Sequence, residues 1–246
     1  MMTEFVKDIK FVCLVWDIIS YIFPGINERD LYAVKELIKT GDTIFDIGAN
    51  IGSYTYTLSK LAGKSGIVIA CEPIDSNIRK LKYVIKKLRL DNVCLEPVAL
   101  SNTNGTCSMI IPLVNGKQKN TRAYIDLENC NATIKQTTLM DLFIAHNLQT
   151  INFIKCDVEG AERLVFEGGS ELIKKYRPTI LCELSESMST RFNTDVNEVF
   201  EYIKELGNYT VYVVKRGEKS LTKVSQINND YINYFFISDR NYEYKN

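Results

Sequence analysis

Residues 43–52 read Thr-Ile-Phe-Asp-Ile-Gly-Ala-Asn-Ile-Gly and carry the strongest structural signal of this chain. The first five residues form a short, mostly apolar run of strand length. Gly48, Asn50 and Gly52 then alternate directly before a stretch with helical periodicity. Glycines at a strand-to-helix turn let the backbone bend sharply and approach a ligand closely, and the first turn of the helix offers unpaired N–H groups. The segment is therefore typical of a turn that binds a nucleotide-like ligand in an α/β protein.

Beyond residue 40 the chain alternates short β-type runs with longer stretches of helical period, which predicts an α/β fold with a mostly parallel sheet and helices on both faces. We expect helices between the first five of seven strands, and a polar loop between the last two. The expected strands are Thr43–Ile47, Ile67–Cys71, Val93–Ala99, Ile151–Cys156, Thr179–Cys182, Tyr209–Val214 and Tyr231–Ile237. We divide the chain into an N-terminal helical segment, 1–40, and one domain, 41–246, with a β-hairpin-like insertion near 106–137.

The N-terminal segment has apolar residues at helical spacing. Its longest apolar stretch, Phe11–Phe23, is shorter than the roughly 20 residues of a membrane-spanning helix and contains Asp17. No small-residue cleavage site follows, so a signal peptide is not expected. A helix that packs on the domain, or on a second subunit in a homodimer, is favoured over a membrane-surface anchor. Seven Cys, an odd number with no C-x-x-C pair, indicate reduced thiols and a cytoplasmic protein.

The composition excludes several classes of function. The chain has 246 residues, 30 Lys+Arg, 30 Asp+Glu and a single histidine, His146. Zero net charge argues against nucleic acid as the main partner. The basic cluster on the expected helix Asp75–Arg89 is interpreted as the solvated face of an amphipathic helix, with RNA binding as the weaker alternative. One histidine excludes a multi-histidine zinc site. We expect His146 at the sheet edge opposite the glycine-bearing turn, without a catalytic role.

Two features indicate which cofactor binds. Glu72 follows the second expected strand, about 20 residues past the turn, where a carboxylate can accept hydrogen bonds from ribose hydroxyls. The turn reads Asp46-x-Gly48-x-Asn50-x-Gly52 and departs from the dinucleotide pattern G-x-G-x-x-G. Asp46 would repel a pyrophosphate but suits a sulfonium or an α-amino group. S-adenosylmethionine has both groups and is favoured over NAD.

From about Gly41 to Glu183, the chain resembles the FkbM family of class I S-adenosylmethionine-dependent methyltransferases. The matching blocks are Gly-Asp-Thr-Ile-Phe-Asp-Ile-Gly-Ala-Asn-Ile-Gly-Ser-Tyr (41–54), Ala-Cys-Glu-Pro (70–73), Val-Ala-Leu-Ser-Asn (98–102), Ile-Lys-Cys-Asp-Val-Glu-Gly-Ala-Glu (154–162) and Arg-Pro-Thr-Ile-Leu-Cys-Glu (177–183). The resemblance implies a Rossmann-like, seven-stranded sheet with a reversed last strand. The cofactor contacts expected at the matching positions are Asp46, Gly48, Ala49, Asn50, Gly52, Glu72, Pro73 and Ser101.

Three carboxylates after the fourth expected strand are the candidate catalytic residues: Asp157, Glu159 and Glu162. Carboxyl ends of parallel strands share one edge of a sheet, so these groups are expected near the cofactor turn. One of them would act as general base or position the acceptor. Mg²⁺ binding and capping of the following helix are the alternatives. Mg²⁺ is possible here, but nothing in the sequence requires it, so no metal ligands are assigned.

The sequence therefore predicts an S-adenosylmethionine-dependent methyltransferase. The resemblance alone suggests that it O-methylates a hydroxyl of a sugar, glycan or small metabolite. The alternatives are an NAD-dependent oxidoreductase, which the spacing of the turn disfavours, and a non-catalytic S-adenosylmethionine-binding module. An RNA methyltransferase is a further alternative, which the neutral charge disfavours.

Overall fold

The computed structural model describes residues 28–110, 113–114, 117–118, 124–125, 132–189, 194–228 and 230–239. Most of the expected N-terminal helical segment, including Phe11–Phe23, lies outside these residues. Its described part, α2 (Glu28–Leu37), is a helix that packs on the main sheet through Ala33 and Val34. No helix in the described part of the chain is long and apolar enough to cross a membrane.

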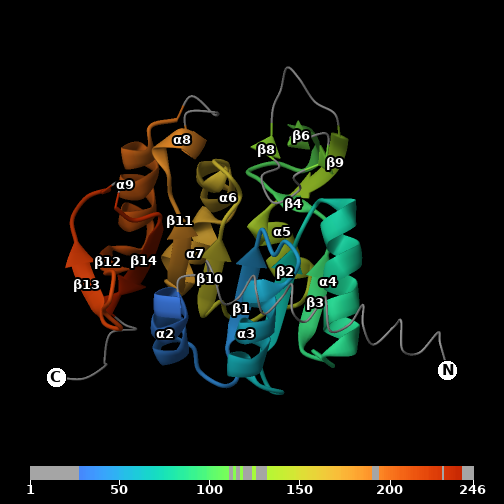
Figure 1. The fold of residues 1–246 in the computed structure, drawn as a ribbon, viewed down its shortest axis with the longest axis horizontal. Helices are drawn as coiled ribbons and strands as arrows, with labels where there is room; N and C mark the ends of the chain where they lie inside the picture. The colour runs from blue at the N-terminus through green and yellow to red at the C-terminus, as the bar shows by residue number, and fades with distance from the viewer. Residues whose placement is uncertain are drawn as a thin grey trace.

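A single large sheet forms the centre of the molecule (Figure 1). Its strands are β1 (Thr43–Ile47), β2 (Ile67–Cys71), β3 (Val93–Glu96), β10 (Phe153–Cys156), β11 (Thr179–Glu183), β12 (Tyr209–Val214), β13 (Leu221–Val224) and β14 (Asn233–Ser238). Their order across the sheet is β13-β12-β14-β11-β10-β1-β2-β3. The strands β3, β2, β1, β10 and β11 are parallel, whereas β14 is antiparallel to both of its neighbours.

The predicted class of fold is confirmed, with a correction to the strand count. β14 is the reversed last strand and lies between β11 and β12. The main sheet has eight strands rather than seven, because Leu221–Val224 in the expected polar loop forms the edge strand β13. β13 is only partly buried and pairs on one side, so it lacks the apolar run of an inner strand.

The expected third strand, Val93–Ala99, is interrupted. β3 ends at Glu96, and Ala99 belongs to β4 (Ala99–Leu100) in a separate sheet. Pro97 lies at the break, where its missing N–H cannot continue the ladder. The apolar, strand-like pattern of the sequence continues on both sides of Pro97, so the sequence predicts one strand instead of two.

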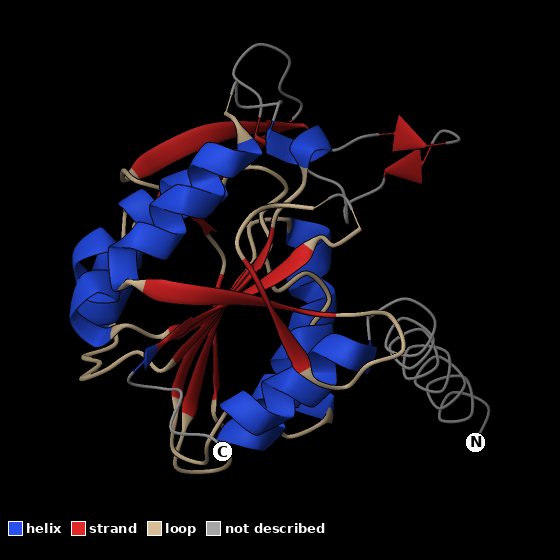
Figure 2. Ribbon diagram, turned by 90° about the vertical axis from the view of Figure 1, so that its left-hand side faces the viewer, coloured by secondary structure: helices blue, strands red, loops and turns tan. Residues whose placement is uncertain are grey.

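Helices cover both faces of the main sheet (Figure 2). Their bounds are α3 Ser53–Ala62, α4 Asp75–Lys87, α5 Leu139–Ala145, α6 Glu162–Glu167, α7 Ser170–Tyr176, α8 Glu186–Ser189 and α9 Val196–Gly207. One core unites α2 and α3 with Ile44, Phe153 and Leu181 of the sheet. A second core, on the opposite face, unites α5, α6, α7 and α9.

A smaller sheet lies on the side of the main sheet at which β3 ends (Figure 1). It consists of β4, β5 (Gly105–Ile110), β8 (Tyr124–Ile125) and β9 (Ala132–Thr137) in the order β4-β9-β5-β8. The described pairing of β5 with β9 is antiparallel, as in a hairpin. A separate pair is formed by β6 (Leu113–Val114) and β7 (Lys117–Gln118). The division of the chain at residue 40 stays a prediction.

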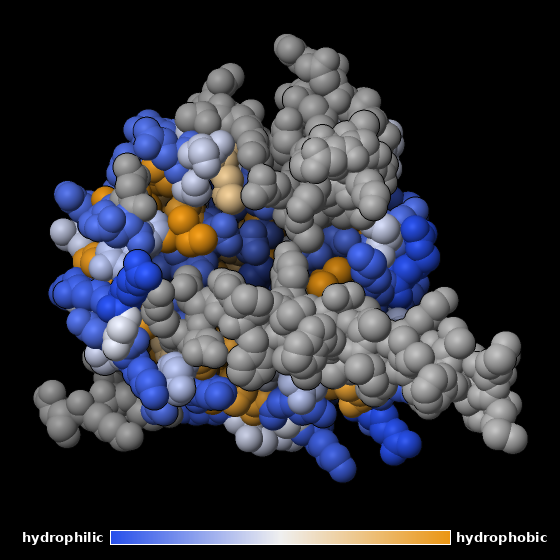
Figure 3. Space-filling view, viewed as in Figure 1, coloured by the Kyte–Doolittle hydropathy of each residue, from blue (hydrophilic) through white to orange (hydrophobic). Residues whose placement is uncertain are grey.

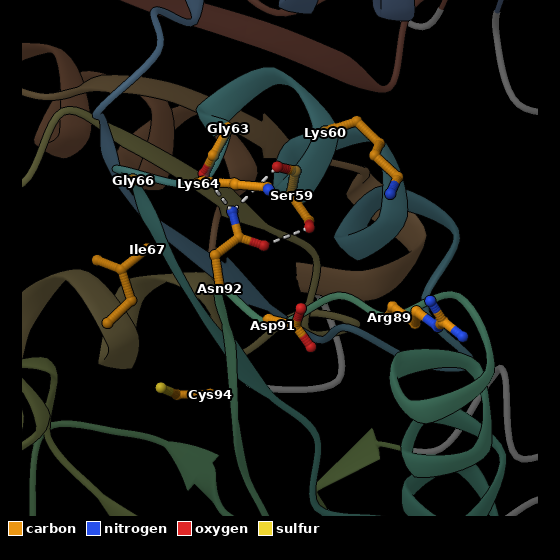
Figure 4. A pocket seen from close by; sticks show the side chains of 10 residues that line it. All are labelled: Ser59, Lys60, Gly63, Lys64, Gly66, Ile67, Arg89, Asp91, Asn92 and Cys94. Atoms are coloured by element: carbon orange, nitrogen blue, oxygen red, sulfur yellow. Dashed lines mark hydrogen bonds between the residues drawn. The ribbon is translucent and has the colours of Figure 1, made fainter.

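The opposite edge of the main sheet contains a cavity of about 670 Å³ (Figure 4). One wall is built by Asn92, which joins the end of α3 to the start of β3. Its Nδ2 donates to the carbonyl oxygens of Ser59 and Gly63 at 3.0 and 2.8 Å, and its Oδ1 accepts a hydrogen bond from the Ser59 hydroxyl at 2.5 Å. Both carbonyl oxygens also accept a backbone N–H, from Gly63 at 3.1 Å and from Gly66 at 3.3 Å respectively, so Asn92 adds a second donor to each.

Asn92→Ala should lower the free energy of unfolding by about 1–3 kcal/mol, because the buried Ser59 hydroxyl loses its acceptor and each of the two carbonyl groups loses one of its two donors. The midpoint of urea unfolding measures this change. Asp91→Ala is the matched control, since Asp91 is exposed beside Asn92, and we expect it to change stability by no more than about 0.5 kcal/mol. Equal losses in the two variants would contradict the capping role of Asn92.

Candidate functional site

The glycine-bearing turn follows β1 and is fixed against β2. The N–H groups of Gly48 and Ala49 both donate to the carbonyl oxygen of Cys71, at 3.0 and 2.9 Å. Gly48, Asn50 and Gly52 have φ values of +77°, +53° and +100°. Only glycine adopts such angles without strain, and asparagine tolerates them better than most residues. The predicted turn is therefore present, and its special residues are needed for its backbone path.

Gly48 also permits a close approach between the turn and the segment after β10. A Cβ atom built on Gly48 would overlap the backbone oxygen of Asp157. The N–H of Asp157 donates to the carbonyl oxygen of Ile47 at 3.1 Å, so the two strand ends are also joined directly. The expected convergence of the cofactor turn and the candidate catalytic segment is therefore seen in the backbone.

Glu72 lies at the carboxyl end of β2 with 4% of its surface exposed. Its Oε2 accepts a hydrogen bond from the N–H of Asn50 at 2.8 Å, and its Oε1 accepts from the N–H of Ile74 and from Nδ2 of Asn77. Burial raises the pKa of Glu72, while these hydrogen bonds oppose the rise. A carboxylate can accept about four hydrogen bonds, so capacity remains for a ligand hydroxyl. Half-buried Pro73 follows directly in the loop to α4.

Three buried polar atoms at the turn have no hydrogen-bond partner among the described residues: Asp46 Oδ1, Asn50 Oδ1 and Ser53 Oγ. The other oxygen of Asp46 accepts from the Thr55 hydroxyl at 2.5 Å. Burial raises the pKa of Asp46, whereas the charge of Lys155 and the hydrogen bond from Thr55 oppose the rise. Buried polar groups are normally paired, so a cluster of unpaired ones indicates a place for a polar ligand. Ser53 was not among the predicted residues, although a small polar residue after the turn is a usable signal.

Lys155 lies at the centre of this site, although the sequence analysis assigned it no role. It belongs to β10 and is 6% exposed. Its Nζ lies 3.1 Å from Oδ2 of Asp157, 3.2 Å from the carbonyl oxygen of Gly48 and 5.4 Å from the centre of the Tyr54 ring. Burial opposes its charge, but the carboxylates of Asp157 and Asp46 outweigh this cost and raise the pKa of Lys155. A lysine inside an apolar strand is the signal that could have found it, because a buried charge requires partners.

The three candidate catalytic carboxylates are placed differently. Asp157 pairs with Lys155 and keeps 32% of its side chain exposed. Glu159 is half-buried in the loop with φ of +57°. Glu162 is buried, and its Oε1 accepts from the N–H groups of Val158 and Gly160 at 3.2 and 3.1 Å. Burial raises the pKa of Glu162 to about 7 against these hydrogen bonds. Glu162 thus holds the loop that precedes its own helix, which corresponds to the capping alternative.

No group of three or more His, Cys, Asp or Glu residues in the described ranges is arranged to hold a metal ion.

Ser101 is buried, and its N–H donates to the carbonyl oxygen of Thr137 at 2.9 Å. A Cβ atom on Gly168, at the end of α6, would overlap the carbonyl oxygen of Ser101. These contacts place Ser101 between the smaller sheet and α6.

The expectation that His146 lies at the edge opposite the turn is wrong. Its Nε2 lies 2.7 Å from Oε1 of Glu96, the last residue of β3, at the carboxyl end of that strand. The N–H of Glu72 donates to the carbonyl oxygen of Glu96 at 3.1 Å, so the pair is next to the cofactor-binding region. The reason is that α5 has only seven residues and starts directly after the smaller sheet, so its end does not reach the far edge.

Figure 3 shows hydrophilic side chains in a recess near the centre of this face of the molecule. A largely parallel sheet with one reversed strand, and a glycine-bearing turn at the carboxyl end of its first strand, together define the class I methyltransferase fold. Solved structures share this fold. They include an FkbM methyltransferase from Methylobacillus flagellatus KT, with a TM-score of 0.53 and 15% identity over 80% of this chain and 43% of that chain. A putative rRNA-methylase from Clostridium thermocellum has a TM-score of 0.52 and 14% identity over 86% and 95% of the two chains.

An O-methyltransferase from Bacillus cereus, solved in complex with SAH, has a TM-score of 0.52 and 13% identity over 91% of this chain and 87% of that chain. Identities this low show similarity of fold alone, and the chain spans less than half of the Methylobacillus protein. No curated protein sequence matches the chain. The family model of the methyltransferase FkbM domain, however, matches residues 46–209. The chain therefore belongs to the FkbM methyltransferase family.

Proposed function

We propose that the chain binds S-adenosylmethionine and transfers its methyl group to a hydroxyl of a sugar, glycan or other small metabolite. The observation that carries the proposal is the unpaired, buried oxygen of Asp46 beside the equally unpaired oxygen of Asn50. Both atoms are hydrogen-bond acceptors and require donors. The α-ammonium group and the ribose hydroxyls of S-adenosylmethionine are donors. A pyrophosphate offers only acceptors, which argues against NAD at this turn.

Different residues at the turn would bind different parts of the cofactor. Asp46, Asn50 and Ser53 would hold the amino-acid part of the cofactor, and Glu72 would accept the ribose hydroxyls. Gly48 and Gly52, with their positive φ values, would give the turn the backbone path that surrounds the ligand. Ala49, Pro73 and Ser101 are proposed contacts on the family resemblance alone. When bound, the cofactor supplies an activated methyl group, and the protein has to hold an acceptor oxygen in line with it at about 3–3.5 Å.

The acceptor side is formed by the residues that follow β10 and β11. We assign Asp157, and with it Glu159 and Glu162, to positioning of the acceptor at this edge. Asp157 is the best placed of the three, because its partly exposed side chain is linked to the turn by Lys155, which donates both to Asp157 and to the carbonyl oxygen of Gly48. The acceptor class, a hydroxylated small molecule or glycan, rests on the family resemblance.

Thermal unfolding with candidate cofactors tests the proposed function. S-adenosylmethionine or S-adenosylhomocysteine at 100 times its Kd should raise the stability of the protein by about 2.7 kcal/mol, which shifts Tm by a few degrees at this size. NAD at the same concentration should leave Tm unchanged. Stabilisation by NAD alone would instead support an oxidoreductase. Binding without methyl transfer to any hydroxylated probe would support the non-catalytic module.

A further inference from the structure

Glu183 lies at the carboxyl end of β11, beside the segment that contains Asp157. Cys182 of β11 pairs with Cys156 of β10, so the next residues, Glu183 and Asp157, come side by side. Alternate residues of a strand point to the same face. Glu183 therefore shares a face with Leu181, as Lys155 does with Phe153, and both apolar residues belong to the core under α2 and α3.

Glu183 differs from the other carboxylates at this edge in its hydrogen bonding. The carboxylates of Asp46, Glu72, Asp157 and Glu162 each receive hydrogen bonds from the protein. Glu159 also has interactions within the molecule. The half-buried carboxyl of Glu183 receives no hydrogen bond or ion pair from any residue that the structure describes. A half-buried carboxyl beside the segment of Asp157, with its hydrogen-bonding capacity unused, is available to a ligand.

We propose that Glu183 is the catalytic carboxylate that contacts the acceptor and removes the proton of its reacting hydroxyl. This assignment rests on the proposed function and gives a catalytic role to a residue that the sequence alone left without one. The acceptor oxygen forms a bond to the methyl carbon as the carbon–sulfur bond breaks. The electron pair of that bond goes to sulfur, and the hydroxyl proton goes to Glu183.

The surroundings of Glu183 suit a general base. Burial and the carboxylates of Asp157, Glu159 and Glu162 raise the pKa of Glu183 to about 8, while Lys155 opposes the rise. Tyr54 of α3 also faces these charges, and Asn233 of β14 pairs with Glu183 in the backbone ladder. Asn233 in turn donates to Asp30 of α2. A general base works best when its pKa lies near the operating pH. Asp157, whose charge is paired with Lys155, is then a positioning residue.

The test compares the wild type with Glu183→Gln and with Glu186→Gln, which replaces an exposed carboxylate three residues further along the chain. Methyl transfer from labelled S-adenosylmethionine to a hexose, a deoxyhexose and a polyol is measured, together with binding of S-adenosylhomocysteine. Glu183→Gln should bind S-adenosylhomocysteine like the wild type and lose at least about 100-fold in kcat/KM. The wild-type kcat/KM should rise with pH until the base is ionised near pH 8, and the variant should lack this rise. Glu186→Gln should behave like the wild type.

Turnover of Glu183→Gln within about fivefold of the wild type, or an unchanged pH profile, would overturn the assignment. If no probe is methylated, the proposal is tested by carbon-13 NMR titration of the glutamate carboxyls in the S-adenosylhomocysteine complex. A resonance that is absent in Glu183→Gln should titrate near pH 8, and titration at the ordinary glutamate pKa of about 4.3 would refute the proposal. Failure of the wild type to bind either cofactor form refutes the proposed function instead, so the two failures are distinguishable.

Discussion

Gly48→Ala should destabilise the protein by about 4 kcal/mol or more and abolish binding of S-adenosylhomocysteine. Two costs add at this position. The φ of Gly48 is +77°, which costs a residue with a Cβ about 1–2 kcal/mol. The new methyl group would also overlap the backbone oxygen of Asp157. Because backbone cannot move aside as a flexible side chain can, relief of the overlap requires the turn to separate from the end of β10.

Gly217→Ala is the matched control for Gly48→Ala. Gly217 has a similar φ of +87°, but a Cβ atom there would meet nothing within 4 Å. It therefore isolates the conformational cost, and we expect a loss of about 1–2 kcal/mol with cofactor binding unchanged. Urea unfolding and calorimetric titration with S-adenosylhomocysteine measure the two effects. Equal losses of stability in both variants would show that the turn and the segment after β10 are not in close contact.

The parts of the site that could be predicted from the sequence are those whose function depends on local backbone. The turn requires positive φ values at Gly48 and Gly52, and the spacing of these glycines after an apolar strand indicates that requirement directly. Glu72 was found in the same way, because its distance from the turn follows from one helix and one strand. The order of the parallel strands then brings the ends of β1, β2, β10 and β11 to one edge.

The residues that sequence reasoning missed depend on contacts between distant segments. Lys155 forms hydrogen bonds with Gly48 and Asp157. The sequence of residues 151–156 does not indicate which charged residue will be the partner of this lysine. Glu183 is distinguished only by the absence of a partner among the described residues, while the other carboxylates of this edge are engaged. His146 was misplaced because the length of α5 depends on where the smaller sheet lies. Such three-dimensional information does not appear as periodicity or spacing.

The balanced charge of the chain conceals a local imbalance at the carboxyl edge of the main sheet. Asp46, Glu72, Asp157, Glu162 and Glu183 gather there around one buried cation, Lys155. The edge is therefore acidic but not uniformly so, because Lys155 neutralises the part nearest the turn. An acidic edge with one internal cation should accept a sulfonium cofactor and a neutral hydroxylated acceptor better than a polyanion.

Lys155→Met should lower the free energy of unfolding by about 3–5 kcal/mol at pH 8, the cost of removing one partner from a buried ion pair. Methionine fills a similar volume, so the loss of packing is small. Asp46 and Asp157, whose charges repel each other, would then lose the cation that acts on both of them in the wild type. Lys82→Met removes an exposed lysine of α4 and is the matched control. It should change stability by no more than about 0.5 kcal/mol.

The penalty of Lys155→Met should shrink as the pH falls from 8 to 5. In the wild type the folded-state pKa of Lys155 is raised above 10.5, so its contribution is fully present below that value and is lost only at higher pH. The pKa of Asp46 is raised by burial, and loss of Lys155 removes a charge that opposes this rise. Protonation of Asp46 then relieves the variant as the pH falls through its folded-state pKa. Urea unfolding across this range measures the difference, and a penalty independent of pH would show that Lys155 acts through packing rather than through its charge.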